Sequence, residues 1–459
     1  MSRLLGDSSR LSIGDGSRLL IRNGRFMDPT VDLDAAAGTA ELLIEDGLIK
    51  TLSTDGNPIP EDGAEVLDAE GAWVVPGLID VHAHLREPGQ EYKEDLATGG
   101  TAAVAGGFTQ VACMANTVPV NDDPSVTKYI LDRAEKESPA KIRPIAAATR
   151  GLKGEVMTEM MALREAGAVA FSDDGSTIMD SGVMRRVLEY SRMAGKPVIV
   201  HAEDCALRGA GVVNEGAVAT KLGLPGNPAA AEEIMVARDI RLASMTGAHL
   251  HIAHVSTAGA VHMIRKAREA GLQVTAEVTP HHLTLTDEAT LEFDTNTRVA
   301  PPLRSHADIE SLRAALAEGV IDVIATDHAP HASYEKEVDF TEAPPGMLGL
   351  ETAVSVSLAL VREGILSPIE FVRRLTTNAA RLLDLEGGSL QPGGVGDIAL
   401  IDAEKEWLYD PAQGFSKSRN SPWAGETLTG KVTATVVDGR LVYHHERTTN
   451  AEYRFDERL

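Results

Sequence analysis

The sequence lacks the features of several protein classes. It holds 43 Lys and Arg against 68 Asp and Glu, a formal net charge of −25, so no basic surplus exists to displace counterions from a nucleic acid. No apolar run reaches the roughly 20 residues that span a bilayer, and the polar start has no apolar signal-peptide core. Its two cysteines, Cys113 and Cys205, are too few for a disulfide framework or a four-cysteine zinc site. We therefore expect a cytoplasmic protein that binds neither nucleic acid nor membrane.

Both ends of the chain have a sequence pattern that is typical of β structure. The first 18 residues show little hydrophobic pattern and are expected to form a disordered extension. Short apolar runs then flank the dipeptides Asn23-Gly24 and Asp46-Gly47, and similar runs flank Asp438-Gly439 near the other end. Each dipeptide favours a type I′ turn and so predicts a β-hairpin. Residues 19–75 and 388–459 are therefore predicted to form the two parts of one small β-sandwich domain.

The middle of the chain, residues 76–387, alternates short β-branched runs with segments of helical period. Eight such runs occur: VVPGLIDVHAH, FTQVACMAN, KIRPIAAAT, AVAFSDD, PVIVHAED, HLHIAHVS, QVTAEVTP and DVIATDHAP. In the helical segment SHADIESLRAALAEG, Ser305 and Asp308 can form a capping box. Eight β-α units predict an α/β fold, a TIM-like (β/α)8 barrel. A doubly wound sheet is the alternative, but no glycine-rich phosphate turn is present.

Residues able to bind metal follow five of these strands. They are Asp80, His82, His84, Asp173, Asp174, His201, His254, Asp327 and His328. In a barrel the carboxyl ends of the strands converge on one mouth, and residues two apart on a strand point to the same side. Four imidazoles and at least two carboxylates exceed the needs of one tetrahedral ion, but they suit two ions that share a bridging carboxylate. We predict two divalent metal ions, with Zn²⁺ favoured over Mn²⁺, Co²⁺ or Fe²⁺.

The sequence resembles the amidohydrolase superfamily and, within it, the bacterial dihydroorotases whose two metals share an aspartate. The resemblance is carried by PGLIDVHAHLREPG, CMANTVPVND, FSDDG, VIVHAED, HIAHVST, VTPHHL, APPLR, ATDHAPH, PPGMLGLET and SKSRNSPWAGETLTGKV. It implies His82, His84 and Asp327 at the first metal, His201 and His254 at the second, and Asp174 as the bridge. Asp173, the adjacent residue, is the competitor for the bridge.

The resemblance also implies a reaction, the reversible cyclisation of N-carbamoyl-L-aspartate to L-dihydroorotate and water in de novo pyrimidine (UMP) biosynthesis. Two cations sharing a water would lower the pKa of that water to give hydroxide, and they would polarise the amide oxygen. Asp327 would both bind metal and shuttle the proton to the ring nitrogen. The implied substrate contacts are His84, Arg86, Asn116 and His331, with main-chain groups of Pro345 and Gly346.

Two other functions stay open. Hydantoinases and allantoinases resemble the chain in outline but bridge their metals with a carboxylated lysine late in the fourth strand. Here that strand reads AGAVAFSDDG, and Lys153 in the preceding loop is expected to be a surface charge. The second alternative is an inactive paralogue that acts as a scaffold for aspartate carbamoyltransferase, although such proteins typically lose metal ligands. A homo-oligomer and an association with that enzyme are both compatible with the sequence.

Three local features need a structure to interpret. Relatives carry Asn or Arg immediately before PPLR, where this chain has Ala300, and Arg298 or Arg304 could compensate. Residues 332–344, after the last strand, are highly charged and are predicted to form a mobile lid over the substrate. A last pair, His281 and His282, could orient metal ligands, because metal sites usually have such partners.

Overall fold

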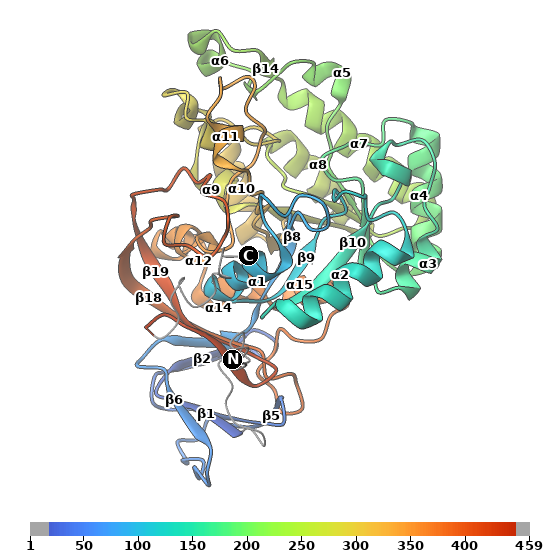
Figure 1. Ribbon diagram of the computed structural model, residues 1–459. Coiled ribbons are helices and arrows are strands. Elements are labelled where there is room, and N and C mark those ends of the chain that lie inside the picture. The colour runs from blue at the N-terminus through green and yellow to red at the C-terminus, as the bar shows by residue number, and fades with distance from the viewer. Residues whose placement is uncertain (1–17, 447–459) are drawn as a thin grey trace, which may run out of the picture.

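The computed structural model describes residues 18–446, and its larger part is a nearly closed barrel of eight parallel strands (Figure 1). In chain order the strands are β8 (Leu78–Ala83), β9 (Phe108–Cys113), β10 (Lys141–Ala146), β11 (Ala170–Ser172), β12 (Val198–Val200), β15 (Leu250–Ile252), β16 (Val274–Val278) and β17 (Val323–Ile324). All eight predicted runs contribute a strand, so the predicted barrel is confirmed. The predicted extension over residues 1–18 lies outside the described residues, except Arg18.

The barrel closes at its mouth. The last strand, β17, is only two residues long, and the chain that follows it meets β8 through a bridge between Ala83 and His328. The main-chain N–H of His84 donates to His328 O at 2.8 Å, and that of Asp327 donates to His82 O at 3.0 Å. Closure therefore places the histidine pair of the first strand directly beside the aspartate of the last.

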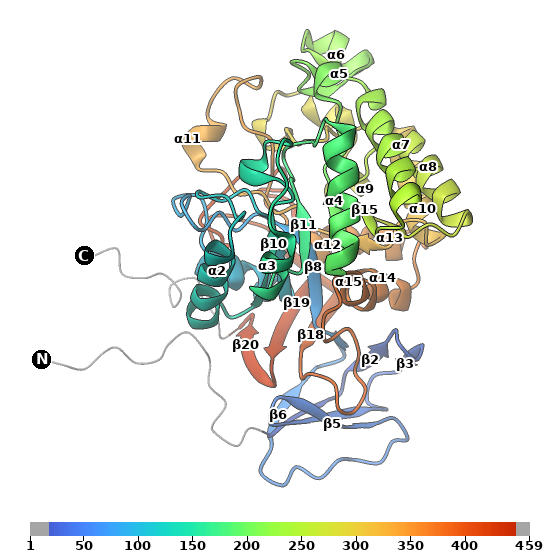
Figure 2. The ribbon, with the colours of Figure 1, turned by 90° about the vertical axis from the view of Figure 1, so that its right-hand side faces the viewer.

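Helices cover the outside of the barrel, as two perpendicular views show (Figures 1 and 2). The helices are α1 (Leu96–Ala105), α2 (Pro124–Glu137), α3 (Met160–Glu165), α4 (Ser181–Ala194), α5 (Cys205–Arg208), α6 (Ala217–Leu222), α7 (Ala229–Thr246), α8 (Ala258–Glu269), α9 (Pro280–Thr284), α10 (His306–Ala317), α11 (Ser333–Lys336), α12 (Ala353–Ser357), α13 (Ala359–Arg362), α14 (Pro368–Leu375) and α15 (Thr377–Leu383). The predicted capping box of Ser305 and Asp308 begins α10 and is confirmed.

The small domain is made of both chain ends and lies below the barrel in Figure 1. One sheet contains β5 (Leu48–Ser53), β4 (Glu41–Glu45), β1 (Arg18–Arg22) and β6 (Glu65–Asp68). The other contains β20 (Arg440–His444), β19 (Thr427–Val437), β18 (Ile398–Leu408), β7 (Trp73–Pro76), β2 (Arg25–Asp28) and β3 (Leu33–Ala35). Leu19 and Ile44 of the first sheet share a buried cluster with Val74 and Ile398 of the second. The two sheets thus enclose one core.

Two of the three predicted hairpins are present. Asp46-Gly47 joins the antiparallel strands β4 and β5, and Asp438-Gly439 joins β19 and β20. The hairpin predicted at Asn23-Gly24 is wrong, because β1 and β2 enter different sheets. Asn23 does adopt the positive φ of 61° expected of such a turn, but a Cβ on Gly24 would lie 2.3 Å from Val74 Cγ2. The dipeptide therefore allows a close crossing between sheets.

The chain passes from the small domain into the barrel at Gly77, between β7 and β8. A Cβ at this position would lie 2.3 Å from the Thr109 side chain, so the crossing needs glycine. The connection between β18 and β19, residues 409–426, leaves the small domain and lies against the barrel mouth, where Ser418 and Asn420 are buried. Part of the predicted second β-sandwich segment thus contributes to the barrel instead.

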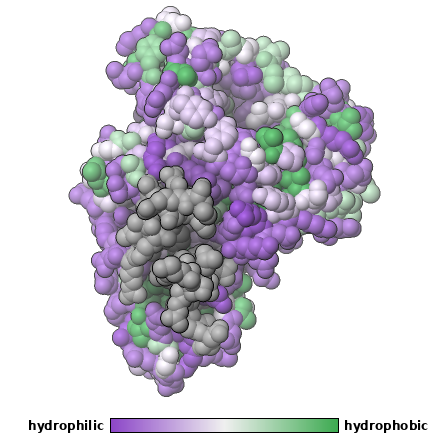
Figure 3. Space-filling model, in the orientation of Figure 1, coloured by the Kyte–Doolittle hydropathy of each residue, from purple (hydrophilic) through white to green (hydrophobic). Residues whose placement is uncertain are grey.

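The face of the molecule in Figure 3 is largely hydrophilic, with hydrophobic side chains in small separate groups. This surface agrees with the excess of acidic side chains in the sequence. Within residues 18–446, no helix combines the length and the apolar character that crossing a bilayer requires.

Candidate metal centre and substrate pocket

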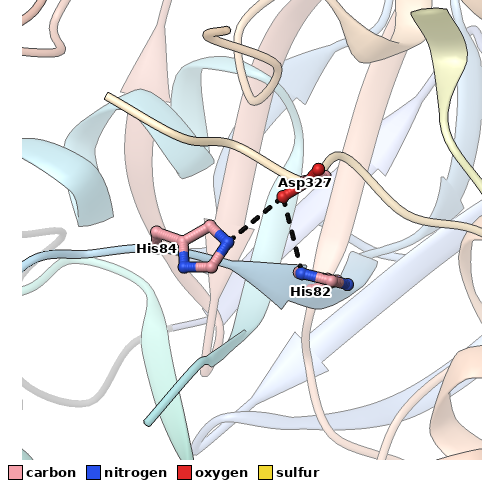
Figure 4. Close-up of side chains that lie close together, drawn as sticks. All are labelled: His82, His84 and Asp327. Carbon is pink, nitrogen blue, oxygen red and sulfur yellow. Dashed lines mark hydrogen bonds and ion pairs between the residues drawn. The ribbon is translucent and has the colours of Figure 1, made fainter. Parts of the chain in front are cut away.

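His82, His84 and Asp327 meet where the first and last strands of the barrel end (Figure 4). The Nε2 atom of His84 lies 3.2 Å from Asp327 Oδ1, and that of His82 lies 3.5 Å from the same oxygen. The two histidines are two residues apart on one extended segment, so both rings point to the same side. All three side chains are buried.

Asp174, just after β11, lies between two pairs of histidines. Its Oδ2 atom is 3.5 Å from His82 Nε2 and 3.4 Å from His84 Nε2. Its Oδ1 atom faces the other way, 3.4 Å from His254 Nε2 and 3.9 Å from His201 Nδ1. Each carboxylate oxygen therefore faces one imidazole pair, which is the arrangement that a carboxylate shared by two cations requires.

Asp173, the competitor for the bridge, is turned away from these imidazoles. It accepts hydrogen bonds from the main-chain N–H and the hydroxyl of Thr149. Burial raises the pKa of Asp173 to about 6, although both hydrogen bonds favour its ionised form. Adjacent residues on an extended segment face opposite sides, so only one of the two aspartates can face the histidines.

The side chains around Asp174 fit divalent cations. The ligand atoms of His82, His84 and Asp327, and those of His82, Asp174 and His254, each lie within 4.8 Å of one another. Two of these atoms, His82 Nε2 and Asp174 Oδ1, are buried without a hydrogen-bond partner. Leaving such atoms unsatisfied is costly, and imidazole nitrogens with carboxylate oxygens form a typical ligand set for a divalent transition metal.

Electrostatics inside the cluster favour ionised carboxylates. Burial opposes ionisation of Asp174, but the imidazoles of His82, His254 and His84 outweigh it and hold its pKa well below the usual value. The pKa of Asp327 is lowered for the same reason, by His82 and His84 against burial. Both aspartates are therefore negatively charged at neutral pH, as metal ligands must be.

Three residues of the site have left-handed backbone conformations, which are uncommon outside glycine. The φ angles are 64° at Arg86, 31° at His254 and 47° at Asp327. Such conformations cost energy and persist only where the surrounding structure enforces them, so they often mark functional sites.

Glu277 on β16 contacts two histidines of the cluster, His82 and His254, and it was not among the residues predicted from the sequence. Its Oε1 atom lies 2.6 Å from His82 Nδ1 and accepts a hydrogen bond from the His254 main chain at 3.2 Å. Its Oε2 atom lies 3.0 Å from His251 Nε2. A carboxylate on the far nitrogen of a ligating histidine fixes the orientation of the ring. The available signal was the single charged residue in the strand run VTAEVTP.

The predicted substrate residues lie on the loops above this cluster. Asn116, after β9, places Oδ1 2.9 Å from His84 Nδ1. Arg86 is buried, which lowers its pKa to about 10, and its Nε donates to the carbonyl of Pro330 at 3.1 Å. Its Nη2 atom lies 3.5 Å from His331 Nε2. The guanidinium group of Arg86 thus lies beside His331 at the mouth of the barrel.

The end of the loop after β17 packs against His331. The Nε2 atom of His331 lies 3.0 Å from the carbonyl oxygen of Pro345. Gly346 has a φ of 134°, and a Cβ there would lie 2.6 Å from Ala329 Cβ and 3.1 Å from His331 Nε2. Glycine is therefore needed to bring the 345–346 backbone to the imidazole.

The residues proposed to replace the polar group missing at Ala300 contact other parts of the molecule. Arg304 donates to Ser256, Asn214 and the carbonyl of Asn227. Arg298 donates to the carbonyls of the 340–343 segment. Both guanidinium groups donate to residues outside the cluster, so no compensation for Ala300 is evident.

The remaining sequence candidates differ in their surroundings. His282 contacts the Thr279 hydroxyl at 2.7 Å and the carbonyl of Pro301 at 3.1 Å, so it supports a turn. The Nε2 atom of His281 is buried without a hydrogen-bond partner, and burial lowers the pKa of this residue to about 4. Lys153 is exposed, which leaves Asp174 as the central anionic group of the cluster.

The predicted lid contains the one-turn helix α11 and three buried residues, Lys336, Phe340 and Ala343. The ammonium of Lys336 donates to the carbonyls of Thr295 and Pro344 at 2.9 and 2.8 Å, and burial lowers its pKa to about 7. The segment is thus more firmly anchored than its charge pattern predicts. Its mobility remains a prediction.

Comparisons with known proteins agree with this architecture. The amidohydrolase family matches residues 73–442. Dihydroorotases from Syntrophus aciditrophicus (strain SB) and Anaeromyxobacter dehalogenans (strain 2CP-1) are 49% and 50% identical to the chain, each over 94% of it, and cover 100% and 98% of those relatives. The chain therefore belongs to the amidohydrolase family, and the resemblance drawn from its motifs is confirmed.

Solved structures give the same fold. An L-hydantoinase (dihydropyrimidinase) from Arthrobacter aurescens aligns with a TM-score of 0.83 at 24% identity, over 94% of this chain and 96% of that one. A dihydropyrimidinase from Brevibacillus agri NCHU1002 aligns with a TM-score of 0.81 at 24% identity, over 95% and 97%. At this identity the likeness establishes the fold alone.

Proposed function

We propose that this amidohydrolase is a dihydroorotase, which interconverts N-carbamoyl-L-aspartate and L-dihydroorotate plus water in pyrimidine biosynthesis. Relatives with this name align over nearly their whole length at about half identity. The observation that carries the proposal is the Asp174 carboxylate, whose two oxygens face separate histidine pairs. It occupies the place where a hydantoinase-like enzyme would need a carboxylated lysine.

We infer that the site holds two divalent ions, with Zn²⁺ favoured by the mixture of imidazole and carboxylate ligands. His82, His84 and Asp327 would hold the first ion, His201 and His254 the second, and Asp174 both. When bound, the two ions supply an activated water and polarise the oxygen of the scissile amide.

Asp327 has the position and the charge for proton transfer. In the hydrolytic direction its carboxylate takes a proton from the attacking water and delivers it to the ring nitrogen as the carbon–nitrogen bond breaks. In the cyclising direction it takes the proton from the carbamoyl nitrogen as the same bond forms, and it passes this proton to the carboxyl oxygen that leaves as water when the carbon–oxygen bond breaks. The lowered pKa of Asp327 keeps the carboxylate ionised at neutral pH.

The loops above the cluster would bind the rest of the substrate. Arg86 offers two parallel donors to the substrate carboxylate, since a guanidinium matches that group bidentately. Asn116 and His331 would add single hydrogen bonds, while His84 and the main chain of Pro345 and Gly346 would contact the ring. These assignments agree with two distances in the structure. Arg86 Nη2 lies 3.5 Å from His331 Nε2, which lies 3.0 Å from the carbonyl oxygen of Pro345.

Substrate selectivity tests the proposal. We expect kcat/KM for L-dihydroorotate to exceed that for hydantoin, dihydrouracil or allantoin by at least about 100-fold, because only dihydroorotate offers a carboxylate to Arg86. Higher activity on hydantoin would favour the hydantoinase-like alternative, and a metal-free, inactive protein would favour the scaffold. The cytoplasmic location, a homo-oligomer and binding to aspartate carbamoyltransferase remain predictions.

A further inference from the structure

We propose that Asn420, in the connection between β18 and β19, is a positioning residue for the substrate side of the site. Its side chain joins the loop segment that carries His331 to the one that carries Gly346. The inference rests on the proposed function, because the position of these two residues affects the reaction only if they contact substrate.

The contacts of Asn420 reach both segments. Its Oδ1 atom accepts a hydrogen bond from the main-chain N–H of His331 at 3.0 Å. Its Nδ2 atom donates to the carbonyls of Ala329 at 2.9 Å and Gly346 at 3.1 Å. Its own carbonyl accepts from the N–H of Leu348 at 2.9 Å. One residue thus holds together the start and the end of the loop after β17.

The chemistry of these contacts is specific to asparagine. The side chain is only 3% exposed, and it uses its acceptor oxygen and both amide hydrogens. Aspartate would keep the acceptor but would set a carboxylate oxygen against two carbonyl oxygens. Alanine would leave two carbonyls and one N–H without their partner, at a site where water has little access.

The connection itself is well anchored at the mouth. The hydroxyl of Ser418 donates to the carbonyl of Lys93 at 2.8 Å, and the N–H of Lys417 donates to Glu94 Oε1 at 3.2 Å. Trp423 packs in a buried cluster with Met347 and Val299. These contacts with the barrel hold the connection, and with it Asn420, at the mouth. The amide of Asn420 transmits that position to His331.

The metal cluster is oriented by other residues. His82 and the main chain of His254 contact Glu277 at 2.6 and 3.2 Å, and His84 contacts Asn116 at 2.9 Å. Loss of Asn420 should therefore disturb substrate binding while leaving the metal content unchanged. His331 also contacts the Pro345 carbonyl and lies near Arg86. Its displacement would therefore loosen the residues proposed to bind the substrate carboxylate.

The test compares Asn420→Asp and Asn420→Ser with the matched control Asn378→Asp. Asn378 also donates to a main-chain carbonyl, Asp322 O at 2.8 Å, but it lies at the opposite end of β17 from the mouth. We expect Asn420→Asp to raise KM for L-dihydroorotate by about 10- to 100-fold, with two metals per chain and a kcat within about threefold of wild type. Asn420→Ser, which keeps one acceptor and one donor, should give an intermediate KM.

Hydrogen exchange of residues 329–348 provides a readout that does not depend on the reaction. In Asn420→Asp the acceptor for the His331 N–H remains, but the carboxylate repels the Ala329 and Gly346 carbonyls and should move the two loop segments apart. Protection of the 329–348 amides should therefore fall in both Asn420 variants and stay at the wild-type level in Asn378→Asp. A lowered melting temperature with unchanged KM and unchanged protection of these amides would overturn the proposal and leave only a structural role. If protection falls but the wild-type enzyme does not turn over dihydroorotate, the hold of Asn420 on the loop stands, while the proposed function, and with it the role in binding this substrate, fails.

Discussion

Replacing Asp174 by Asn removes one charge and one ligand oxygen while keeping the shape of the side chain. The carboxylate faces four imidazoles at 3.4 to 3.9 Å, and its Oδ1 atom has no other partner. We expect the metal content to fall from two ions per chain to one or none. Metal activation contributes several kcal/mol to such reactions and about 1.4 kcal/mol is tenfold in rate, so kcat should fall at least ~10³-fold.

Asp173→Asn is the matched control for this variant. Asp173 is adjacent to Asp174 and equally buried at 5% exposure, but its partner is Thr149. We expect it to cost roughly 1–3 kcal/mol of folding stability, from the weakened hydrogen bonds to Thr149, and to retain two metals. Elemental analysis, dihydroorotate turnover and thermal unfolding on both variants decide the matter. Asp174→Asn with two metals and near-normal kcat, beside a metal-free Asp173→Asn, would refute the assignment of the bridge.

Three further predictions concern the substrate side and the thiols. Arg86→Lys keeps the charge but loses the planar guanidinium, so KM should rise by about 10- to 100-fold, equivalent to roughly 1.5 to 3 kcal/mol. The metal content should not change, and a normal KM would place Arg86 outside the site. Hydrogen exchange of residues 332–346 should slow when a dihydroorotate analogue saturates the enzyme, and equal exchange with and without it would exclude lid closure. Burial raises the pKa of the Cys113 thiol to about 12 while Cys205 is exposed, so a thiol reagent should modify one group in the native protein and none in Cys205→Ser.

The barrel could be predicted from the sequence because its signal is periodic and local. Strands buried on both faces appear as short apolar runs, and helices between them show a 3.6-residue period. Even β17, with only two regular residues, was recognisable by the polar residues that follow it. The turn at Asn23-Gly24 was misread because local turn chemistry does not specify which sheet the next strand joins.

The less predictable parts of the site depend on contacts between distant segments. Asp173 and Asp174 are chemically identical, and only the hydrogen bonds of Asp173 to Thr149 distinguish their directions. Glu277 is 195 positions from His82, and Asn420 is 89 positions from His331. No sequence pattern at these residues indicates such partners, because the pairing is set by the way the barrel closes and by the return of the 409–426 connection to its mouth.

Titration of metal-free protein with Zn²⁺, followed by turnover of L-dihydroorotate, tests the central claim most directly. We expect activity to rise until two ions are bound per chain and then to level off, with cyclisation of N-carbamoyl-L-aspartate appearing over the same range. Full activity with one ion per chain, or no turnover of either compound at any metal content, would contradict a two-metal dihydroorotase site around Asp174.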